Sequence, residues 1–240
     1  MEVKTEAIVL QALDYKDNDK ILTLFSPTLG KITAGIKGVK KPKAKLAFAS
    51  QPFCFAEYVL AEKGGRYTVT SAYLHESFFD LRLNIDGFYA GCAMAEVCRK
   101  LSLENERYES LFIAFIEGLK GLCLTQGDFG ETLIPFLLIA LLESGYPIHL
   151  GLLEECDGDI GEKLYFDFTD GQFNTFANPT GERASLSTYH VLRKCAGLSY
   201  DEKQTTGGAK RALRLLKRYI SEKTEEIFEN LSEFIRMYEA

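Results

Sequence analysis

The chain has 240 residues, a formal net charge of −6, and a composition that is 46% hydrophobic and 26% charged. These values exclude disorder as the main state, and 20 glycines with only 6 prolines exclude a collagen-like or low-complexity chain. The length fits one large domain or two modest ones. The six cysteines form no Cys-x-x-Cys pair, which favours reduced thiols in a cytosolic protein over a disulfide scaffold or a zinc knuckle.

The first third of the chain has the pattern of short β-strands. Stretches rich in aliphatic and β-branched residues predict strands at 4–13, 20–25, 31–37, 52–62 and 67–75. The tetrapeptide Lys63-Gly64-Gly65-Arg66 predicts a tight hairpin between the last two. Five such strands with short turns and one long loop predict a closed barrel of the OB-fold type over residues 1–78.

From residue 79 onward the pattern becomes helical. Asn84 is a good N-cap, and the expected helices are 84–101, 108–123, 129–145, 186–196 and from about 207 to the end. The third is apolar nearly all round and is expected at the centre, ending at Gly145. Residues 150–181 are expected as a hairpin-like, slightly β-like insertion. The fold class is therefore α+β, with a barrel followed by a mainly α-helical domain, 79–240.

Charge is distributed unevenly along the chain. No acidic residue lies between Asp19 and Glu57, and that window holds seven lysines: Lys20, Lys31, Lys37, Lys40, Lys41, Lys43 and Lys45. An acidic protein with one wholly basic segment is expected to present it to an anion. The alternative is a solvated loop without a partner. The turn formers Gly38 and Pro42, and the repulsion among such dense like charges, favour an anion.

The order of short motifs then indicates a family. The motifs are Thr5–Leu10, Tyr15 with Asp19–Phe25, Gly30-Lys31, Ala34, Lys37-Gly38 with the basic loop to Leu46, Gln51-Pro52-Phe53, Glu76-Ser77-Phe78, Leu81-Arg82, Phe136-Leu137 and Glu143–Pro147. In this order the set resembles the RecO family of bacterial recombination mediators, over about two thirds of the chain.

The resemblance implies a non-catalytic DNA repair and recombination mediator without a cofactor, in the cytoplasm and associated with the nucleoid. Such a protein binds single- and double-stranded DNA, anneals complementary strands, and helps load the RecA recombinase together with RecR. The side chains expected to contact DNA are Lys31, Lys37, Lys40, Lys41, Lys43 and Lys45. Alternatives are a metal-dependent nuclease and an RNA-binding OB protein acting in translation.

The family often carries a four-cysteine zinc element after the Gly-Tyr-x-Pro motif, and this sequence departs from it. Cys156 stands at the first ligand position, but Asp159 replaces its partner and no second pair occurs in 165–180. One thiol cannot hold a tetrahedral structural zinc ion, so no zinc is expected. We expect the insertion to be packed instead by apolar side chains: Leu164, Phe166, Phe168, Phe173 and Phe176.

No catalytic constellation is evident in the sequence. Asp157 does not open a calcium loop, because Gly161 and Phe168 stand where ligands belong, and Asp17 with Asp19 fits a turn better than a metal site. His75, His149 and His190 are far apart, and there is no nucleophile elbow or phosphate loop. The N-terminus lacks a signal peptide pattern, and the longest apolar stretch, 133–142, is too short to span a bilayer.

A second basic patch is expected on the C-terminal helix, where Arg211, Arg214 and Arg218 share one face. It is either an ordinary amphipathic surface helix or, as the resemblance implies, part of a site for the acidic, apolar-ended tail of single-stranded DNA-binding protein. The barrel also contains aromatic side chains able to stack on bases or to fill its core: Tyr15, Phe25, Phe53, Phe55, Tyr58 and Tyr67.

Overall fold

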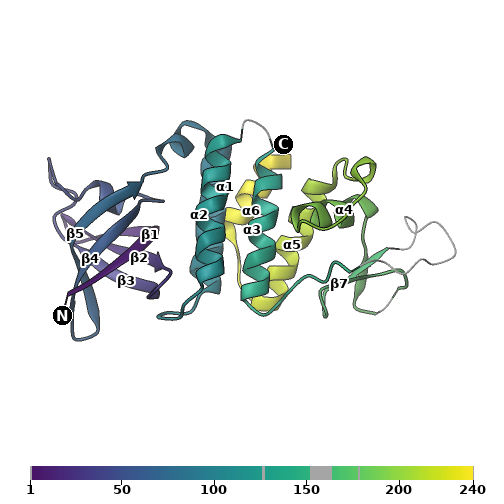
Figure 1. The fold of residues 1–240 in the computed structure, drawn as a ribbon, viewed down its shortest axis with the longest axis horizontal. Helices are drawn as coiled ribbons and strands as arrows, with labels where there is room; N and C mark the ends of the chain where they lie inside the picture. Colours follow the sequence, from purple (N-terminus) through teal and green to yellow (C-terminus); the bar gives the residue numbers. More distant parts are fainter. Residues whose placement is uncertain (1, 126–127, 152–163, 178, 240) are drawn as a thin grey trace. The chain divides into compact units, whose positions relative to one another are not determined.

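The computed structural model describes residues 2–125, 128–151, 164–177 and 179–239, and is shown in Figure 1. The chain forms two compact units, Met1–Cys123 and Leu124–Ala240. The first unit therefore contains two helices besides the strands. An OB domain bounded at residue 78 and a helical domain from 79 remain a prediction from the sequence.

Five strands form the closed barrel predicted from the sequence, in the order β1-β2-β3-β5-β4 (Figure 1). The strands are β1 Glu2–Tyr15, β2 Asp19–Ser26, β3 Gly30–Ile36, β4 Phe55–Lys63 and β5 Arg66–Glu76. Neighbouring strands are antiparallel, except that β3 pairs with β5 in parallel from Ala34 to Ile36. The expected hairpin is present, since Lys63 pairs with Arg66.

The barrel interior follows the two-residue period of its strands. On β3, Ile32, Ala34 and Ile36 are buried, whereas Thr33 between them is exposed. The core continues with Leu22 and Leu24 on the neighbouring strand. This alternation leaves side chains such as Ile21 of β2 and Thr33 of β3 on the outer surface, where a ligand can reach them.

Two helices, α1 Ile85–Leu101 and α2 Glu109–Leu124, follow the barrel after the short 3-10 helix η2 Phe79–Leu83. The Asn84 side chain caps α1 by accepting the amide of Gly87 at 3.0 Å, as its sequence position predicts. Phe25 of the barrel packs against Phe112 of α2 with ring centroids 5.8 Å apart. Aromatic contacts thus join the barrel to the helices within the first unit.

The second unit is built on four helices: α3 Phe129–Glu143, α4 Leu186–Cys195, α5 Gly208–Thr224 and α6 Glu229–Glu239. One side of α3 is buried, but Leu142 is 58% exposed, so the helix is not buried all round as its composition predicts. The chain turns at Gly145 with a φ of 81°. The sequence predicts one helix from about residue 207 to the end. The structure has two, α5 and α6, because the chain leaves the helical conformation at Glu225, which has a φ of 56°. No helix in the described ranges is both long and apolar enough to cross a membrane.

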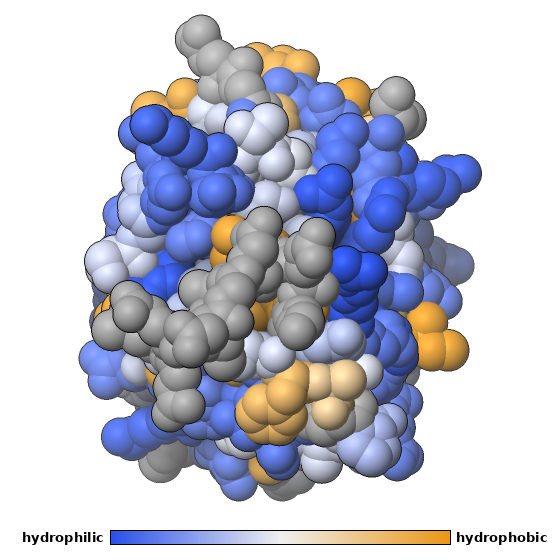
Figure 2. Space-filling view, turned by 90° about the vertical axis from the view of Figure 1, so that its right-hand side faces the viewer, coloured by the Kyte–Doolittle hydropathy of each residue, from blue (hydrophilic) through white to orange (hydrophobic). Residues whose placement is uncertain are grey.

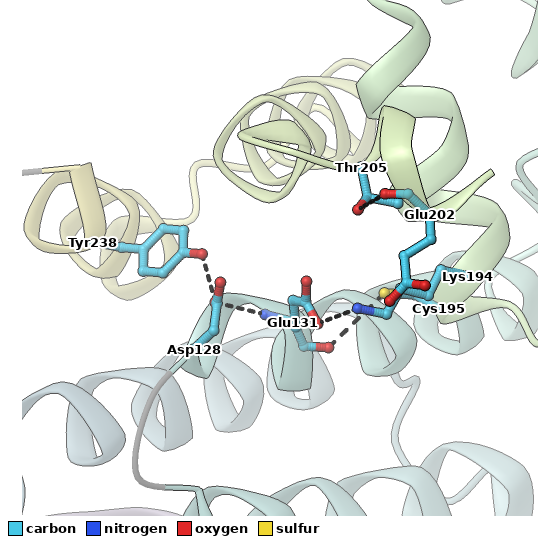
Figure 3. Close-up of polar contacts among 7 residues, drawn as sticks. All are labelled: Asp128, Glu131, Lys194, Cys195, Glu202, Thr205 and Tyr238. Carbon is cyan, nitrogen blue, oxygen red and sulfur yellow. Dashed lines mark hydrogen bonds and ion pairs between the residues drawn. The ribbon is translucent and has the colours of Figure 1, made fainter. Parts of the chain in front are cut away.

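Polar contacts at the start of α3 tie it to two other helices (Figure 3). Asp128 caps α3 by accepting the amide of Glu131 at 3.0 Å, and it also accepts the Tyr238 hydroxyl of α6. The Glu131 carboxylate pairs with Lys194 of α4 at 2.7 Å, and this hydrogen bond raises the pKa of Lys194. Because these groups satisfy one another, they form a structural clamp.

The insertion contains a small sheet of order β7-β6-β8, with β6 Tyr165–Asp167, β7 Gln172–Asn174 and β8 Gly181–Arg183. Leu164, Phe166 and Phe173 are buried, as predicted, and Phe168 is half-buried. The prediction for Phe176 is wrong, because its side chain is 65% exposed. It follows the end of β7, where the alternation that buries Phe173 no longer applies.

Candidate nucleic-acid interface

The lysine loop, residues 37–47, joins β3 to the 3-10 helix η1 Phe48–Ser50 through consecutive tight turns. The amides of Lys41, Ala44 and Ala47 donate to the carbonyls three residues earlier at 3.1–3.2 Å. Gly38 opens the loop with a φ of 69°, a conformation that glycine adopts without strain. The loop therefore has a defined backbone conformation despite its concentration of charge.

Three apolar side chains hold this loop on the barrel. Val39 belongs to the barrel core at 7% exposure, and Leu46 and Phe48 pack against the same core. The exposed lysines of this segment are Lys37, Lys40, Lys41, Lys43 and Lys45. Because apolar contacts fix the backbone while the lysine side chains are exposed, the part of the loop that carries the cations is ordered before a ligand arrives.

The loop is also bonded to the turn between β1 and β2. The Asp19 carboxylate accepts the amide of Gly38 at 2.8 Å, and the Asn18 carbonyl accepts the amide of Lys40 at 3.1 Å. Asp19 therefore has the backbone-supporting role that its turn position predicts. Its effect is to hold the start of the lysine loop in place.

One loop lysine has an acidic partner. Lys40 Nζ lies 2.7 Å from Asp14 Oδ2, and both side chains are substantially exposed. The hydrogen bond from Lys40 lowers the pKa of Asp14, so this group is a carboxylate throughout the neutral range. An exposed pair of this kind is weak, and a phosphate can compete for the ammonium group.

Removing the Asp14 carboxylate tests whether it competes with phosphates for Lys40. We expect Asp14→Asn to raise the affinity for DNA about two- to five-fold at low salt. The reason is that Lys40 no longer has to break an ion pair with Asp14 before it can bind a phosphate. Fluorescence anisotropy with a labelled oligonucleotide measures the change. The exposed Asp17 provides the control, since Asp17→Asn removes the same charge from the turn that follows β1. An equal rise in both variants would show that only general charge matters.

Lys31 lies apart from the other five predicted lysines. It is the second residue of β3, about 20 Å along the chain from Lys37, which follows the strand, and it is half-buried. Its ammonium group donates to the carbonyl of Arg99 at 2.7 Å. We therefore place Lys31 at the contact between the barrel and α1 and leave it out of the candidate interface.

A hollow of about 650 Å³ opens on the outer surface of the barrel. The barrel hollow is lined by Tyr15, Asp19, Lys20, Ile21, Thr33, Gly35, Ile36, Lys37, Gly65, Arg66, Tyr67 and Thr68. Lys37 belongs to both the hollow and the lysine loop. The two features are therefore contiguous and form one candidate interface.

The sequence reasoning missed Arg66 and did not assign Lys20 to the site. Arg66 closes a hairpin and pairs with Lys63, and the sequence pattern around it predicts only a turn. The parallel pairing of β3 with β5 brings the start of β5 beside the end of β3. This parallel closure, which no local pattern encodes, places Arg66 on the same hollow as Lys37.

Acidic side chains outnumber basic ones on two of the remaining strands, β1 and β4, whereas β5 carries one of each. The glutamates of β1, β4 and β5 are Glu2, Glu6, Glu57, Glu62 and Glu76. Glu6 and Glu57 lie directly opposite each other across the β1–β4 pairing. A polyanion is repelled by such a surface and attracted to the lysine loop, so the barrel has one cationic side.

The three predicted arginines of the second unit lie on α5, and each has a polar partner in the fold. Arg211 donates to the Ser187 hydroxyl at 2.9 Å. Arg214 pairs with Glu239, and Arg218 pairs with both Glu182 and Glu222. The guanidinium of Arg218 also lies 4.3 Å from the centroid of the Phe168 ring.

A hollow of about 430 Å³ borders these arginines and contains the rings of Phe166 and Phe168. The hollow thus combines apolar rings with the three arginines, and their role in binding a partner stays a prediction from the sequence. The face of the molecule seen in Figure 2 is mainly hydrophilic, with small separate apolar areas. An incoming carboxylate must displace the protein's own glutamates from Arg214 and Arg218.

The predicted absence of zinc concerns Cys156 and Asp159, and these residues, like Asp157, lie outside the described ranges. Within those ranges, no group of three or more His, Cys, Asp or Glu side chains is arranged to hold a metal ion. The cysteines of the described part of the chain are free thiols: Cys54, Cys92, Cys98, Cys123 and Cys195. Burial raises the pKa of Cys92 and of Cys195 to about 11, which keeps both thiols protonated at neutral pH.

A closed five-stranded barrel followed by a helical part with a small separate sheet defines an α+β protein of the OB-fold class. The chain matches the family description "Recombination protein O N terminal" over residues 1–78 and "Recombination protein O C terminal" over residues 82–231. It therefore belongs to the RecO family, which confirms the resemblance of the motifs.

Individual relatives agree with this assignment, and each carries the name DNA repair protein RecO. The protein of Clostridium novyi is 31% identical over 193 residues, 79% of this chain and 75% of that protein. The protein of Acetivibrio thermocellus is 30% identical over 166 residues, 69% of this chain. That alignment spans 66% of the relative, just under two thirds of its length.

Proposed function

We propose that this protein is a non-catalytic DNA repair and recombination mediator that binds single- and double-stranded DNA through the cationic side of its barrel. The observation that carries the proposal is the lysine loop, in which Val39 and Leu46 are held by the barrel while the lysines between them remain exposed. Membership of the RecO family supports the repair role. In this proposal the protein anneals complementary strands and, with RecR, helps load RecA.

Annealing requires two polyanions to approach each other. A surface that neutralises phosphates lowers this electrostatic barrier, and it needs no covalent step. The acidic strands of the same barrel keep DNA on one side. The two strands to be paired are then bound on a common surface, which raises their local concentration.

The electrostatic part of the proposal predicts a steep salt dependence. If four or five ammonium groups of the lysine loop contact phosphates, log K against log salt concentration has a slope of about −2.8 to −3.5 for single strands. For duplex DNA the slope is steeper, at about −0.9 per contact. Anisotropy titrations at several salt concentrations measure both. A slope near zero would contradict a phosphate-binding role for the loop.

The annealing activity is tested with two complementary strands coated with single-stranded DNA-binding protein. The expected result is that the wild-type protein accelerates duplex formation and leaves the strands uncleaved. A magnesium-dependent loss of the labelled oligonucleotide would instead support a nuclease. Competition between matched DNA and RNA oligonucleotides separates the third possibility, since a site built for RNA contacts the 2′-hydroxyl.

For the second unit, we propose that Arg211, Arg214 and Arg218 form part of a site for the acidic tail of single-stranded DNA-binding protein. Support comes from the hollow beside them, where Phe166 and Phe168 supply an apolar floor. The test is the affinity of the tail peptide for the triple alanine variant. An unchanged affinity would remove these arginines from the site.

A further inference from the structure

The two basic surfaces of the protein differ in how far the protein itself balances their charge. Among the described residues, Lys40 is the one lysine of the lysine loop that pairs with a carboxylate. The second surface is the arginine face of α5, formed by Arg211, Arg214 and Arg218. Two of these arginines pair with carboxylates, and Arg218 has two such partners. The lysine loop therefore attracts a polyanion much more strongly than the arginine face does.

Three glutamates balance the arginine face, and they come from three different elements. Glu182 of β8 pairs with Arg218, and Glu222 of α5 accepts from Arg218 Nε at 2.6 Å. The hydrogen bond from Arg218 lowers the pKa of Glu182, so this group is a carboxylate at neutral pH. Glu239, in the last turn of α6, pairs with Arg214. Segments that are distant in the chain thus place their carboxylates on one helix face.

The neighbours of Glu239 hold it in position. The Tyr238 hydroxyl donates to Asp128 (Figure 3), and the Tyr238 ring lies so close to Gly130 that a Cβ added there would be 2.6 Å from it. Lys210 donates to the backbone carbonyl of Glu239 at 3.3 Å. A carboxylate on a fixed backbone loses less entropy when it forms an ion pair than one on a mobile segment. Its arginine partner is therefore balanced by a built-in group.

The hollow beside the arginine face shows which ligands these glutamates affect. Its basic lining residues are four arginines: Arg183, Arg211, Arg214 and Arg218. Such a concentration of guanidinium groups would attract the phosphates of DNA if it were not balanced, since arginine binds phosphate readily. Glu182 lines the same hollow, so its carboxylate lies on the path of an entering phosphate.

A ligand of the arginine face must exchange its own anions for those of the protein. A phosphate that replaces Glu182 or Glu222 on Arg218 gains one ion pair and breaks another, so its net electrostatic gain is small. The ligand then needs a second contribution, and burial of an apolar group supplies one. Phe166, Phe168 and Leu215 line the hollow and can contact such a group. A sugar-phosphate backbone has no apolar group of this kind.

We propose that Glu182, Glu222 and Glu239 are specificity determinants, which neutralise the arginine face toward DNA and leave it available to a peptide with both carboxylates and an apolar end. This inference rests on the proposed function, because it takes the lysine loop as the DNA site and the arginine face as the peptide site. Weakening the wrong complex contributes to specificity as much as strengthening the right one. DNA and the peptide then bind to different surfaces and do not compete.

The first test measures DNA binding where the lysine loop is weakened, in the Lys41→Glu/Lys43→Glu variant. In this background, Glu182→Gln/Glu222→Gln/Glu239→Gln is expected to raise the affinity for duplex DNA about ten-fold at low salt, because three carboxylates no longer balance the arginines. Fluorescence anisotropy measures the change. Glutamine keeps the size of the side chain, and exposed ion pairs contribute little to stability, so the variant is expected to fold like its parent.

Two controls separate the position of the charge from its amount. The matched control, Glu2→Gln/Glu109→Gln/Glu202→Gln, removes three exposed carboxylates from other elements. It is expected to change the affinity for DNA less than about three-fold, because no group of arginines is released. The second control adds the triple alanine substitution of the arginine face to the glutamine variant. This addition is expected to abolish the gain in DNA binding.

The second test measures the affinity for the tail peptide of single-stranded DNA-binding protein with the lysine loop intact. The glutamine variant is expected to bind the peptide about two- to five-fold more tightly than the wild type, since the peptide no longer displaces internal carboxylates. A gain in DNA affinity no larger than that of the matched control, or a peptide affinity that does not rise, would overturn the inference. Neither result affects the proposed function, which fails if the wild-type protein binds neither DNA nor the peptide.

Discussion

Changing Lys40, Lys41, Lys43 and Lys45 together to glutamate is expected to lower the affinity for both single- and double-stranded DNA by roughly two to four orders of magnitude at physiological salt. Each substitution removes a phosphate contact and adds a repulsive charge. The four side chains are exposed, and the loop backbone is held by Val39, Leu46 and Phe48. The variant is therefore expected to fold like the wild type and to differ in binding alone.

A matched pair of double variants separates the position of the charge from its amount. Lys41→Glu/Lys43→Glu changes the lysine loop, whereas Lys4→Glu/Lys63→Glu makes the same charge change on β1 and β4. The first is expected to lose most of the affinity and the second little of it. Equal losses would show that net charge, and not the cationic side of the barrel, controls binding.

The annealing rate should follow the binding affinity in this series. Because strand pairing depends on neutralising phosphates, the quadruple variant is expected to give the uncatalysed rate with strands coated by single-stranded DNA-binding protein. Stopped-flow measurement with a donor and an acceptor dye on the two strands gives this rate. Normal annealing by a variant that no longer binds DNA would place the activity in another part of the protein.

The sequence predicts the barrel well because its signals are local. Two-residue alternation marks the strands, and Lys63-Gly64-Gly65-Arg66 marks the hairpin, in which both glycines take positive φ values. The cap at Asn84 and the stop at Gly145 depend equally on near neighbours. These features need only a few residues of context, so one sequence is enough to find them.

The candidate site depends more on contacts between distant residues. The charge pattern groups Lys31 with the loop lysines. In the structure its ammonium group instead donates to the carbonyl of Arg99, 68 positions away in the chain, at the contact between the barrel and α1. Arg66 reaches the hollow through the parallel pairing of β3 with β5. Neither contact has a local signature. A run of like charges therefore predicts that an interface exists more reliably than it predicts which members form it.

Gly30→Ala is expected to lower the free energy of unfolding of the first unit by about 3 kcal/mol. Gly30 has a φ of 69°, and a Cβ added there would overlap the backbone carbonyl of Glu106. The segment around Glu106 is bonded to the start of β3 and to the turn before it, because Asn105 donates to the Lys31 carbonyl at 3.0 Å and Arg107 donates to the Thr28 carbonyl at 2.8 Å. The backbone cannot move away without breaking these bonds. The melting temperature is expected to fall by roughly 10 °C, which thermal circular dichroism measures.

The control for this substitution is Gly64→Ala, because Gly64 also has a positive φ, 58°, but an added Cβ there meets nothing within 4 Å. That variant carries only the backbone strain and is expected to lose about 1 kcal/mol. Equal losses in the two variants would contradict a steric clash at Glu106. DNA binding supplies the decisive comparison, since the lysine loop lies at the other end of β3 from Gly30. Below its melting temperature, Gly30→Ala is expected to bind DNA like the wild type, because this contact stabilises the barrel on its helices and contributes no cation to the interface.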